Sequence, residues 1–266
     1  MSLSVARLAA EVRQRNPLVH NITNYVAAPL QANALSAIGA SPIMADDAEE
    51  VAEMVSLSDG LVINLGTLNR RTIDSMHTAM RTARTKGIPI VFDPVGAGAT
   101  ELRRQTAHEL LAQHPVSIIR ANAGEIAFLA ENAYFGKGVD AGIAPEKPLD
   151  IARKVARRHG CIVAMTGETD YITDGIRTYV CHNGDAMMSV LVGTGCTATS
   201  VVAAFAATHP HNLLAAATAA LCYYGLCGEI AAEEAVGPGS LAAALLDNLY
   251  RLPEEVIEQS GRLSVI

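Results

Sequence analysis

The chain has 266 residues, of which 50 % are apolar and 18 % are charged, and its net charge is −7. This composition excludes an intrinsically disordered chain, and the acidic balance excludes a general nucleic-acid-binding surface. The length suits one α/β domain with a substantial core, so we expect residues 1–266 to form a single domain.

The cysteines are odd in number, scattered, and without the paired spacing of a zinc site: Cys161, Cys181, Cys196, Cys222 and Cys227. No apolar secretion segment stands at the N-terminus. Free thiols are typical of a reducing compartment. We therefore expect the protein to be cytoplasmic.

The pattern along the chain predicts alternating helices and strands. A first helix has an apolar stripe at Val5, Leu8, Ala9 and Val12, and residues 16–17 end it. Short apolar runs predict strands at residues 61–65, 88–92, 116–119 and 161–165. Helical patterns occupy residues 71–86, 100–113, 123–132 and 149–159. Continuous Val and Ile strands covered by helices on both faces indicate an α/β fold with a mostly parallel central sheet.

Three segments in the second half need separate interpretations. Residues 170–173 and 177–181, joined across Asp174-Gly175, predict a hairpin at the sheet edge. Residues 135–148 are rich in Gly and Pro and are the best candidate for a mobile loop. No charged residue occurs between Asp185 and Glu229, and we interpret this run as two buried core helices instead of membrane spans.

Four polar clusters share one placement, because each directly follows an expected strand. They are Met44-Ala45-Asp46-Asp47, Asp93-Pro94-Val95-Gly96-Ala97-Gly98, Asn122-Ala123-Gly124-Glu125 and Thr166-Gly167-Glu168. In open α/β sheets, ligands bind outside the carboxyl ends of the strands. We therefore expect the clusters to form one ligand site.

A glycine turn, Gly193-Thr194-Gly195-Cys196, precedes an alanine-rich helix. Glycines let the backbone approach a ligand, and the free N–H groups of the helix start attract anions, although a packing turn has the same pattern. A helix N-terminus also lowers a thiol pKa, so Cys196 is expected to be reactive instead of an inert buried cysteine.

Two carboxylates at strand exits, Asp93 and Glu125, suit Mg²⁺, directly or through water, and each alone would also serve as a helix cap. Arg120 closes an apolar strand, where its planar guanidinium suits phosphate oxygens, with a structural ion pair as the alternative. Thr166 and the glycine after it offer a hydroxyl and a close backbone approach to a nucleotide.

The segment His20-Asn21-Ile22-Thr23-Asn24-Tyr25 gathers polar side chains before a helix. Capping by Thr23 or Asn24 explains part of this excess, and substrate contact explains the rest. His20 has no identifiable partner and is expected to be structural. The chain contains neither the Gly-Lys-Ser/Thr phosphate loop nor the Gly-x-Gly-x-x-Gly dinucleotide fingerprint, which disfavours the common ATP and NAD folds.

Taken together, these motifs resemble those of the hydroxyethylthiazole kinase family, in the family's order and spacing, across most of the chain. The resemblance rests on His20-Asn21-Ile22-Thr23-Asn24, Asp93-Pro94-Val95-Gly96-Ala97-Gly98, Asn122-Ala123-Gly124-Glu125, Thr166-Gly167 with Asp170, and Gly193-Thr194-Gly195-Cys196. It implies a ribokinase-like fold and transfer of the ATP γ-phosphoryl to the hydroxyl of 4-methyl-5-(2-hydroxyethyl)thiazole in thiamine biosynthesis or salvage. It also implies Mg²⁺ as cofactor.

The resemblance further assigns a role to each motif residue. Arg120 and Thr166 would contact ATP, and Asp93 with Glu125 would hold magnesium. The thiazole alcohol would contact Asn24, Met44 and Gly193, while Gly193, Gly195 and Cys196 would form the catalytic turn. The family also implies a homotrimer with active sites between subunits, to which residues 20–25 would contribute. No nucleic-acid or membrane partner is expected.

Two rival functions stay open at this point. A hydroxymethylpyrimidine-type kinase or an ATP-dependent hydratase on the same fold would share the turn and the carboxylates, but the wider ribokinase-like group usually has Asp where this chain has Cys196. A non-catalytic nucleotide sensor would keep the site without turnover. The role of the thiol is also open: it either accepts the proton of the hydroxyl or only orients that hydroxyl.

Overall fold

The structure is a computed structural model that describes residues 3–131 and 147–266, and in these residues nine strands form one sheet in the order β2-β1-β3-β4-β5-β6-β7-β8-β9. The parallel part comprises β1 (Leu18–Ile22), β2 (Ser41–Ile43), β3 (Gly60–Asn64), β4 (Ile90–Asp93), β5 (Ile118–Asn122) and β6 (Ile162–Thr166). The antiparallel part comprises β7 (Asp170–Thr173), β8 (Thr178–Cys181) and β9 (Leu263–Val265). The expected α/β class with a mostly parallel sheet is confirmed.

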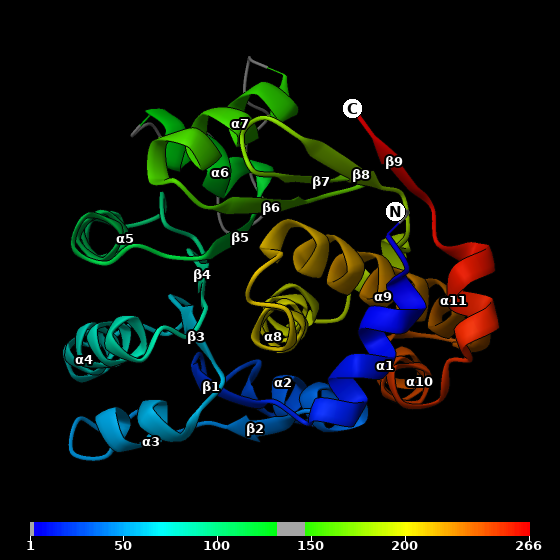
Figure 1. Cartoon of the computed structure of the whole chain (residues 1–266), viewed down its shortest axis with the longest axis horizontal. Helices are drawn as coiled ribbons and strands as arrows, with labels where there is room; N and C mark the ends of the chain where they lie inside the picture. Colours follow the sequence, from blue (N-terminus) through cyan, green and yellow to red (C-terminus); the bar gives the residue numbers. More distant parts are fainter. Residues whose placement is uncertain (1–2, 132–146) are drawn as a thin grey trace.

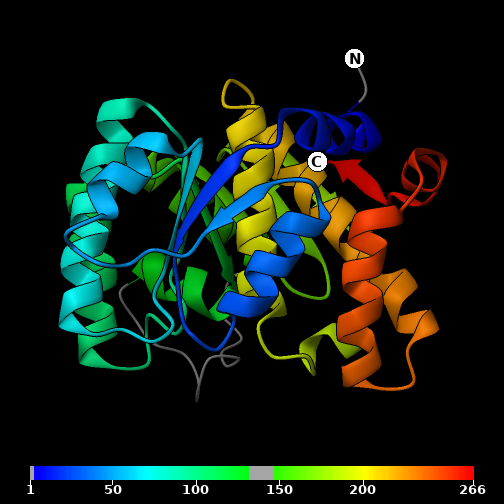
Figure 2. The same ribbon diagram turned by 90° about the horizontal axis from the view of Figure 1, so that it is seen from below.

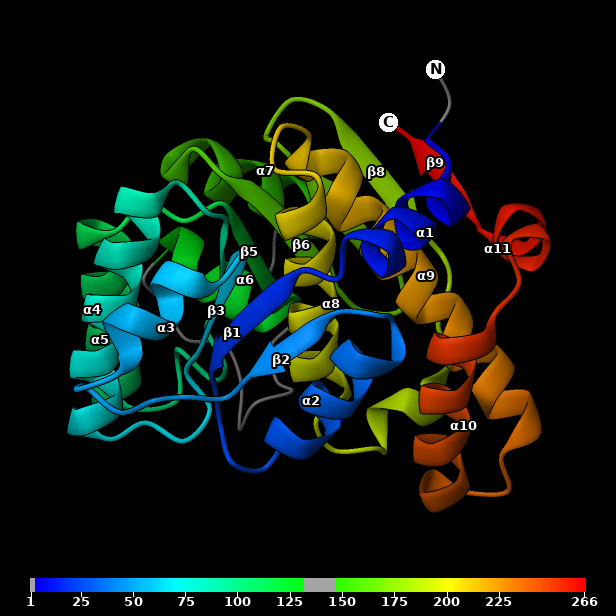
Figure 3. The ribbon, with the colours of Figure 1, turned by 60° about the horizontal axis from the view of Figure 1, so that its bottom comes forward.

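Helices cover both faces of this sheet (Figure 1). One face carries α3 (Val51–Leu57), α4 (Arg70–Lys86), α5 (Glu101–Gln113), α6 (Ala123–Glu131) and α7 (Pro148–His159). The other carries α1 (Val5–Arg15), α2 (Ala28–Ala37), α8 (Thr194–Thr208), α9 (Leu213–Glu234), α10 (Pro238–Arg251) and α11 (Glu254–Ser260). A short 3₁₀ helix, η1 (Ala186–Ser189), leads into α8. Helix α8 lies against the middle of the sheet, beside β1 (Figures 2 and 3).

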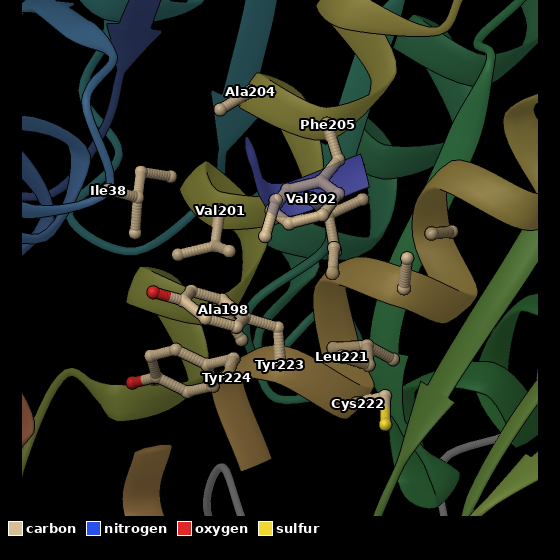
Figure 4. Packing of buried hydrophobic residues seen from close by; sticks show 14 of the residues in the cluster. Ile38, Ala198, Val201, Val202, Ala204, Phe205, Leu221, Cys222, Tyr223 and Tyr224 are labelled. Carbon is tan, nitrogen blue, oxygen red and sulfur yellow. The ribbon is translucent and has the colours of Figure 1, made fainter. Parts of the chain in front are cut away.

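The two-residue period of each strand divides the core between the two faces. Val62 and Ile118 pack toward α8 and α9, whereas Ile63 and Ile119 pack toward α4 and α5. The run without charges forms α8 and α9, as expected. Figure 4 shows the contact between these helices, where the ring centroids of Phe205 and Tyr223 are 6.1 Å apart.

Helix α9 is, among the described residues, long and apolar enough to span a membrane by length and composition. However, 78 % of its most apolar stretch is buried inside the fold. Small residues on both helices allow this close packing, and Ala203, Ala206, Ala216 and Ala220 are fully buried. The apolar character of the run is therefore explained by its place in the core.

Some expectations need correction. The hairpin β7–β8 does not form the sheet edge, because β9 pairs with β8. Arg120 does not close its strand but lies in the middle of β5. The strands β1 and β9 were not predicted as elements, and β2 was expected only as the strand before Met44. Residues 135–146 of the expected mobile loop lie outside the described residues, and Pro148 begins α7.

Candidate active site

The strand ends and the start of α8 meet at one edge of the sheet. Asn64 ends β3, Asp93 ends β4 and Thr166 ends β6, as the parallel arrangement requires. A cavity of about 590 Å³ opens there. Its walls include Arg120, Thr166, Asp170, Thr194, Gly195 and Tyr224. Of the four predicted clusters, the one at Thr166 lines this cavity and the other three do not.

The glycine turn begins α8 in a conformation that requires glycine. Gly193 has φ of +95°, and its carbonyl accepts the N–H of Thr197 at 2.8 Å. This first bond of the helix leaves the N–H groups of Gly195 and Cys196 without acceptors in the helix. The hydroxyl of Tyr224 donates to the carbonyl of Thr194 at 2.9 Å and supports the turn. The turn therefore has the geometry of an anion site.

Arg120 lies directly against this turn. Its Nη2 donates to Oγ1 of Thr166 at 2.5 Å, and its Nε is buried without a hydrogen-bond partner. No carboxylate in the described part of the chain lies within 4.0 Å of its guanidinium, so the structural ion pair is not present there. A half-buried guanidinium that has no carboxylate partner and lies beside a helix N-terminus is suited to bind an anion.

Asp93 is held by one of its two carboxylate oxygens. Its Oδ2 accepts hydrogen bonds from Nδ2 of Asn64 at 2.8 Å and from Oγ1 of Thr199 at 2.7 Å. Its Oδ1 is buried and has no hydrogen-bond partner. Burial raises the pKa of Asp93, against the opposing effect of the Arg120 charge. Its side chain does not cap a helix.

Glu125 is the second buried carboxylate. Its Oε1 accepts the N–H of Gly96 at 2.8 Å and its Oε2 accepts the N–H of Asn122 at 2.9 Å. Burial, and then the charge of nearby Asp93, raise the pKa of Glu125 to about 7. Two carboxylates that oppose each other's ionisation, one with an unpartnered oxygen, fit a cation. Within the described residues, no group of three His, Cys, Asp or Glu side chains could hold a metal by itself.

Cys196 does not have the lowered pKa that its helix position predicts. Burial, and then the Asp93 charge, raise the pKa of its thiol to about 11. The side chains of Asn64 and of Asn24, which donates to the sulfur at 3.4 Å, lower this pKa, but desolvation is the larger effect. The expected reactive thiolate is therefore wrong for this structure. At neutral pH the thiol is protonated.

The remaining predicted residues lie on the side of β1 and β2. Asn24 is buried, and its Oδ1 accepts the N–H of Ala27 at 2.9 Å, which closes the turn before α2. The expected capping is wrong, because Ala27 is the N-cap of α2 and no side chain caps this helix. Met44 follows β2 at the sheet edge and does not line the cavity of about 590 Å³. His20 is fully buried with Nε2 at 2.6 Å from the carbonyl oxygen of Ala45, as a structural histidine would be.

Sequence reasoning missed several side chains that organise the site. Asn64 and Thr199 hold Asp93, and Gln31 donates to the carbonyl oxygen of Cys196 at 2.9 Å. Only Asn64 had a visible signal, since it is a polar residue at the end of an apolar strand. Thr199 and Gln31 are polar residues inside helices, where the sequence carries no sign that they face the site.

Comparison with known proteins identifies the family. A model of the hydroxyethylthiazole kinase family matches residues 9–255. The chain belongs to this family. It is 45 % identical over 258 residues to a hydroxyethylthiazole kinase from Desulfatibacillum aliphaticivorans, covering 97 % of this chain and 96 % of that one. It is 44 % identical over 262 residues to the hydroxyethylthiazole kinase from Moorella thermoacetica, covering 98 % of both chains.

Solved structures agree with this membership in the hydroxyethylthiazole kinase family. A hydroxyethylthiazole kinase protein from Pyrococcus horikoshii OT3 has a TM-score of 0.90 and 40 % identity, with 98 % of both chains covered. A ribokinase-like superfamily protein from Enterococcus faecalis V583 has a TM-score of 0.65 at 12 % identity, covering 95 % of this chain and 96 % of the other. The latter similarity shows the fold alone and confirms the expected ribokinase-like architecture.

Proposed function

We propose that this family member transfers the γ-phosphoryl group of ATP to the hydroxyl of 4-methyl-5-(2-hydroxyethyl)thiazole, in thiamine biosynthesis or salvage. The observation that carries the proposal is the meeting of three features at one cavity edge. They are the N–H groups of the glycine turn that have no acceptor in the helix, the guanidinium of Arg120, which has no carboxylate partner, and the oxygen of Asp93 that has no hydrogen-bond partner. Phosphoryl transfer depends mainly on alignment and charge stabilisation, which these groups supply.

ATP is assigned to the cavity of about 590 Å³. Arg120 and Thr166 contact its phosphates, and the N–H groups of Gly195 and Cys196 stabilise the transferred group. Arg120 is oriented by its bond to Thr166, so its fork is positioned before the nucleotide enters. A structure of pyridoxal kinase from Staphylococcus aureus in complex with ADP has this fold, with a TM-score of 0.59 at 13 % identity.

Magnesium is assigned to Asp93 and Glu125. Oδ1 of Asp93 would bind it directly or through water, and Glu125 would contribute negative charge from its place on α6. When bound, Mg²⁺ would neutralise charge on the phosphates. Burial, and then the charge of Asp93, are also what raise the pKa of Cys196.

The thiazole alcohol is assigned to the side of the turn formed by Asn24, Met44 and Gly193. Because the thiol of Cys196 is protonated at neutral pH, we assign to it the orientation of the substrate hydroxyl. Asn24 holds the sulfur in place through its side-chain amide. The catalytic turn therefore comprises Gly193, Gly195 and Cys196.

The chain is further proposed to act as one kinase domain in a cytoplasmic homotrimer. Its five cysteines are free thiols, as expected for a reducing compartment. Large apolar side chains are exposed beside the glycine turn and the start of α2: Tyr25 at 79 %, Val26 at 57 %, Val190 at 61 % and Val192 at 71 %. Such a patch is typical of a subunit interface. Residues 20–25 would then contribute to a neighbouring site.

A coupled assay of ADP release tests the function. The purified protein is given ATP and Mg²⁺ with the thiazole alcohol, with hydroxymethylpyrimidine, or with no acceptor. We expect turnover with the thiazole alcohol alone. Equal or faster turnover with the pyrimidine would indicate a pyrimidine-alcohol kinase. No turnover with either alcohol would support the non-catalytic nucleotide sensor.

A further inference from the structure

Asn64 occupies a position between the proposed cation side and the acceptor side of the site. It ends β3 and is 1 % exposed. Its Nδ2 donates to Oδ2 of Asp93 at 2.8 Å, and its Oδ1 accepts from Nδ2 of Asn24 and from the N–H of Gly66, both at 2.9 Å. Exchanging the two ends of this amide would oppose donors to donors, so its orientation is determined by its partners.

On the acceptor side, the orientation of Asn24 is determined in the same way. Its Oδ1 accepts the N–H of Ala27, so its Nδ2 must face Oδ1 of Asn64 and the sulfur of Cys196, 3.4 Å away. A Cβ atom at Gly66 would lie 2.3 Å from Cβ of Asn24, so glycine is required there for this close packing. Asn64 therefore fixes the group that holds the thiol.

On the cation side, Asn64 determines which oxygen of Asp93 is available. With Oδ2 bonded to both Asn64 and Thr199, only Oδ1 has no partner. Hydrogen bonds to a single oxygen fix the rotation of the carboxylate and so aim the other oxygen. Loss of the Asn64 amide would leave one of these two donors.

The backbone around Asn64 is also fixed to the segment that follows Asp93. Arg103 of α5 donates to the carbonyl oxygens of Leu65 and Gly66, next to Asn64, and to that of Val95 at 2.5 Å. One guanidinium thus joins the two strand exits. The distance between Asn64 and Asp93 is therefore maintained by the main chain as well as by the side chains.

We propose that Asn64 is a positioning residue that couples the cation-facing carboxylate of Asp93 to the thiol of Cys196 through Asn24, and this rests on the proposed kinase function. One amide with three fixed partners keeps the acceptor hydroxyl and the cation in one alignment. Because the rate of phosphoryl transfer depends mainly on alignment of the reacting groups, loss of this alignment lowers kcat more than it weakens ATP binding.

Three variants separate the two arms of this network. The cation arm is the hydrogen bond from Asn64 to Asp93, and the acceptor arm is the hydrogen bond from Asn24 to Asn64 together with the contact of Asn24 with the thiol. Asn64→Ala removes both arms. Thr199→Val, of equal size, removes the second donor to Asp93 and leaves the acceptor arm. Asn24→Asp keeps the acceptor for Ala27 but removes the donor to the thiol and to Asn64. Steady-state kinetics give kcat and the KM of ATP for each protein. The Mg²⁺ midpoint is the Mg²⁺ concentration that gives half of the thermal shift in the presence of ADP. The fourth readout is the rate at which iodoacetamide alkylates Cys196 without metal.

Asn64→Ala is expected to lower kcat by about tenfold or more while the KM of ATP stays within about threefold. It should change both the Mg²⁺ midpoint and the alkylation rate by about threefold or more. Of these last two readouts, Thr199→Val should shift the Mg²⁺ midpoint alone, and Asn24→Asp the alkylation rate alone. A kcat of Asn64→Ala within about twofold of the natural protein, or a shift in only one of its two other readouts, overturns the proposal.

Folding and the proposed function are controlled separately. If Asn64→Ala does not fold, the double variant Asn24→Asp/Thr199→Val weakens both arms while Asn64 remains, and it must show both shifts and the loss of kcat. Absence of these changes in the folded double variant overturns the proposal. Failure of the natural protein to turn over would contradict the kinase function, whereas the Mg²⁺ and alkylation readouts need no turnover.

Discussion

A Cβ atom at Gly195 would lie 2.9 Å from Nη1 of Arg120 and 3.2 Å from Nη2. The glycine in the first turn of α8 therefore leaves room for the guanidinium, which its bond to Thr166 holds in the cavity wall. The motif glycine and the strand arginine, 75 residues apart in the sequence, form one site because each fits the space that the other leaves.

Gly195→Ala should displace the guanidinium and raise the KM of ATP by about fivefold to twentyfold. The KM of the thiazole alcohol should change little, because Arg120 lies on the nucleotide side. Gly239→Ala is the matched control, since Gly239 is also the second residue of its helix and an added Cβ there meets no atom within 4 Å. Steady-state kinetics that leave the KM of ATP unchanged in Gly195→Ala would refute the steric relationship.

Arg120→Ala should raise the KM of ATP by about tenfold or more, far more than it raises the KM of the alcohol. Thr166→Val removes the hydrogen bond that orients the guanidinium and should have a smaller effect of the same kind. Titration of each substrate at saturating levels of the other measures both values. An unchanged KM of ATP in Arg120→Ala would remove this residue from the nucleotide site.

The fold was largely predictable because its signals are local. Apolar runs in the sheet interior and the uncharged run of α8 and α9 are visible as composition, and the polar clusters mark strand exits. Strand β1 was missed because His20 and Asn21 interrupt its apolar pattern. Both side chains are buried in the fold, where Nε2 of His20 lies 2.6 Å from the carbonyl oxygen of Ala45 and Oδ1 of Asn21 accepts the hydroxyl of Ser200 at 2.8 Å, while Nδ1 of His20 has no hydrogen-bond partner in the described part of the chain.

Polar motifs at the strand exits and the glycine turn were visible in the sequence, but the electrostatics of their side chains were not. The position of Cys196 after the glycine turn indicates a helix N-terminus, yet the depth of its burial and the charge of Asp93 depend on tertiary packing. Asn64 belongs to an apolar run in the sequence, and its two side-chain partners, Asn24 and Asp93, come from other strand exits. Such networks combine residues that only the three-dimensional fold brings together.

Replacement of Cys196 tests how much the thiol contributes. Cys196→Ala should lower kcat modestly, by about tenfold or less, because orientation of the hydroxyl is lost while the turn and Arg120 remain. Cys196→Asp should keep or raise activity, because a carboxylate can accept the proton that the neutral thiol does not. Single-turnover rates measure both. Equal and complete loss in the two variants would contradict this assignment of the position.

The trimer predicts a sedimentation mass of about three times the chain mass of 27.9 kDa. Val192→Asp places a charge in the exposed apolar patch and should shift the assembly toward monomer, with loss of activity. Val236→Asp is the control, because Val236 is 99 % exposed, follows α9 and is not one of the residues that define the patch. A monomer of the natural protein at working concentrations would exclude a trimeric site.

Asp170 makes the stability of the protein depend on pH. Its Oδ1 accepts the N–H of Gly167 at 3.0 Å, but burial raises its pKa from 3.8 to about 6. A carboxyl group with a raised pKa binds its proton more tightly in the folded state, so its ionisation destabilises the fold as pH rises from about 4 to about 6. Above that interval the full effect is present.

Asp170→Asn keeps the acceptor for Gly167 and removes the ionisation. The free energy of unfolding of the variant relative to the natural protein should therefore rise by up to about 3 kcal/mol between pH 4 and pH 7. Urea unfolding without nucleotide at the two pH values measures this difference. Asp174→Asn is the control, because the pKa shift of Asp174 has the opposite sign: burial alone would raise the pKa of Asp174, but the N–H groups of Ile176 and Arg177 lower it below its usual value. The effect of its ionisation lies below about pH 4, so the relative stability of Asp174→Asn should change little between pH 4 and pH 7. A rise of the same size in both variants would contradict the assignment to Asp170.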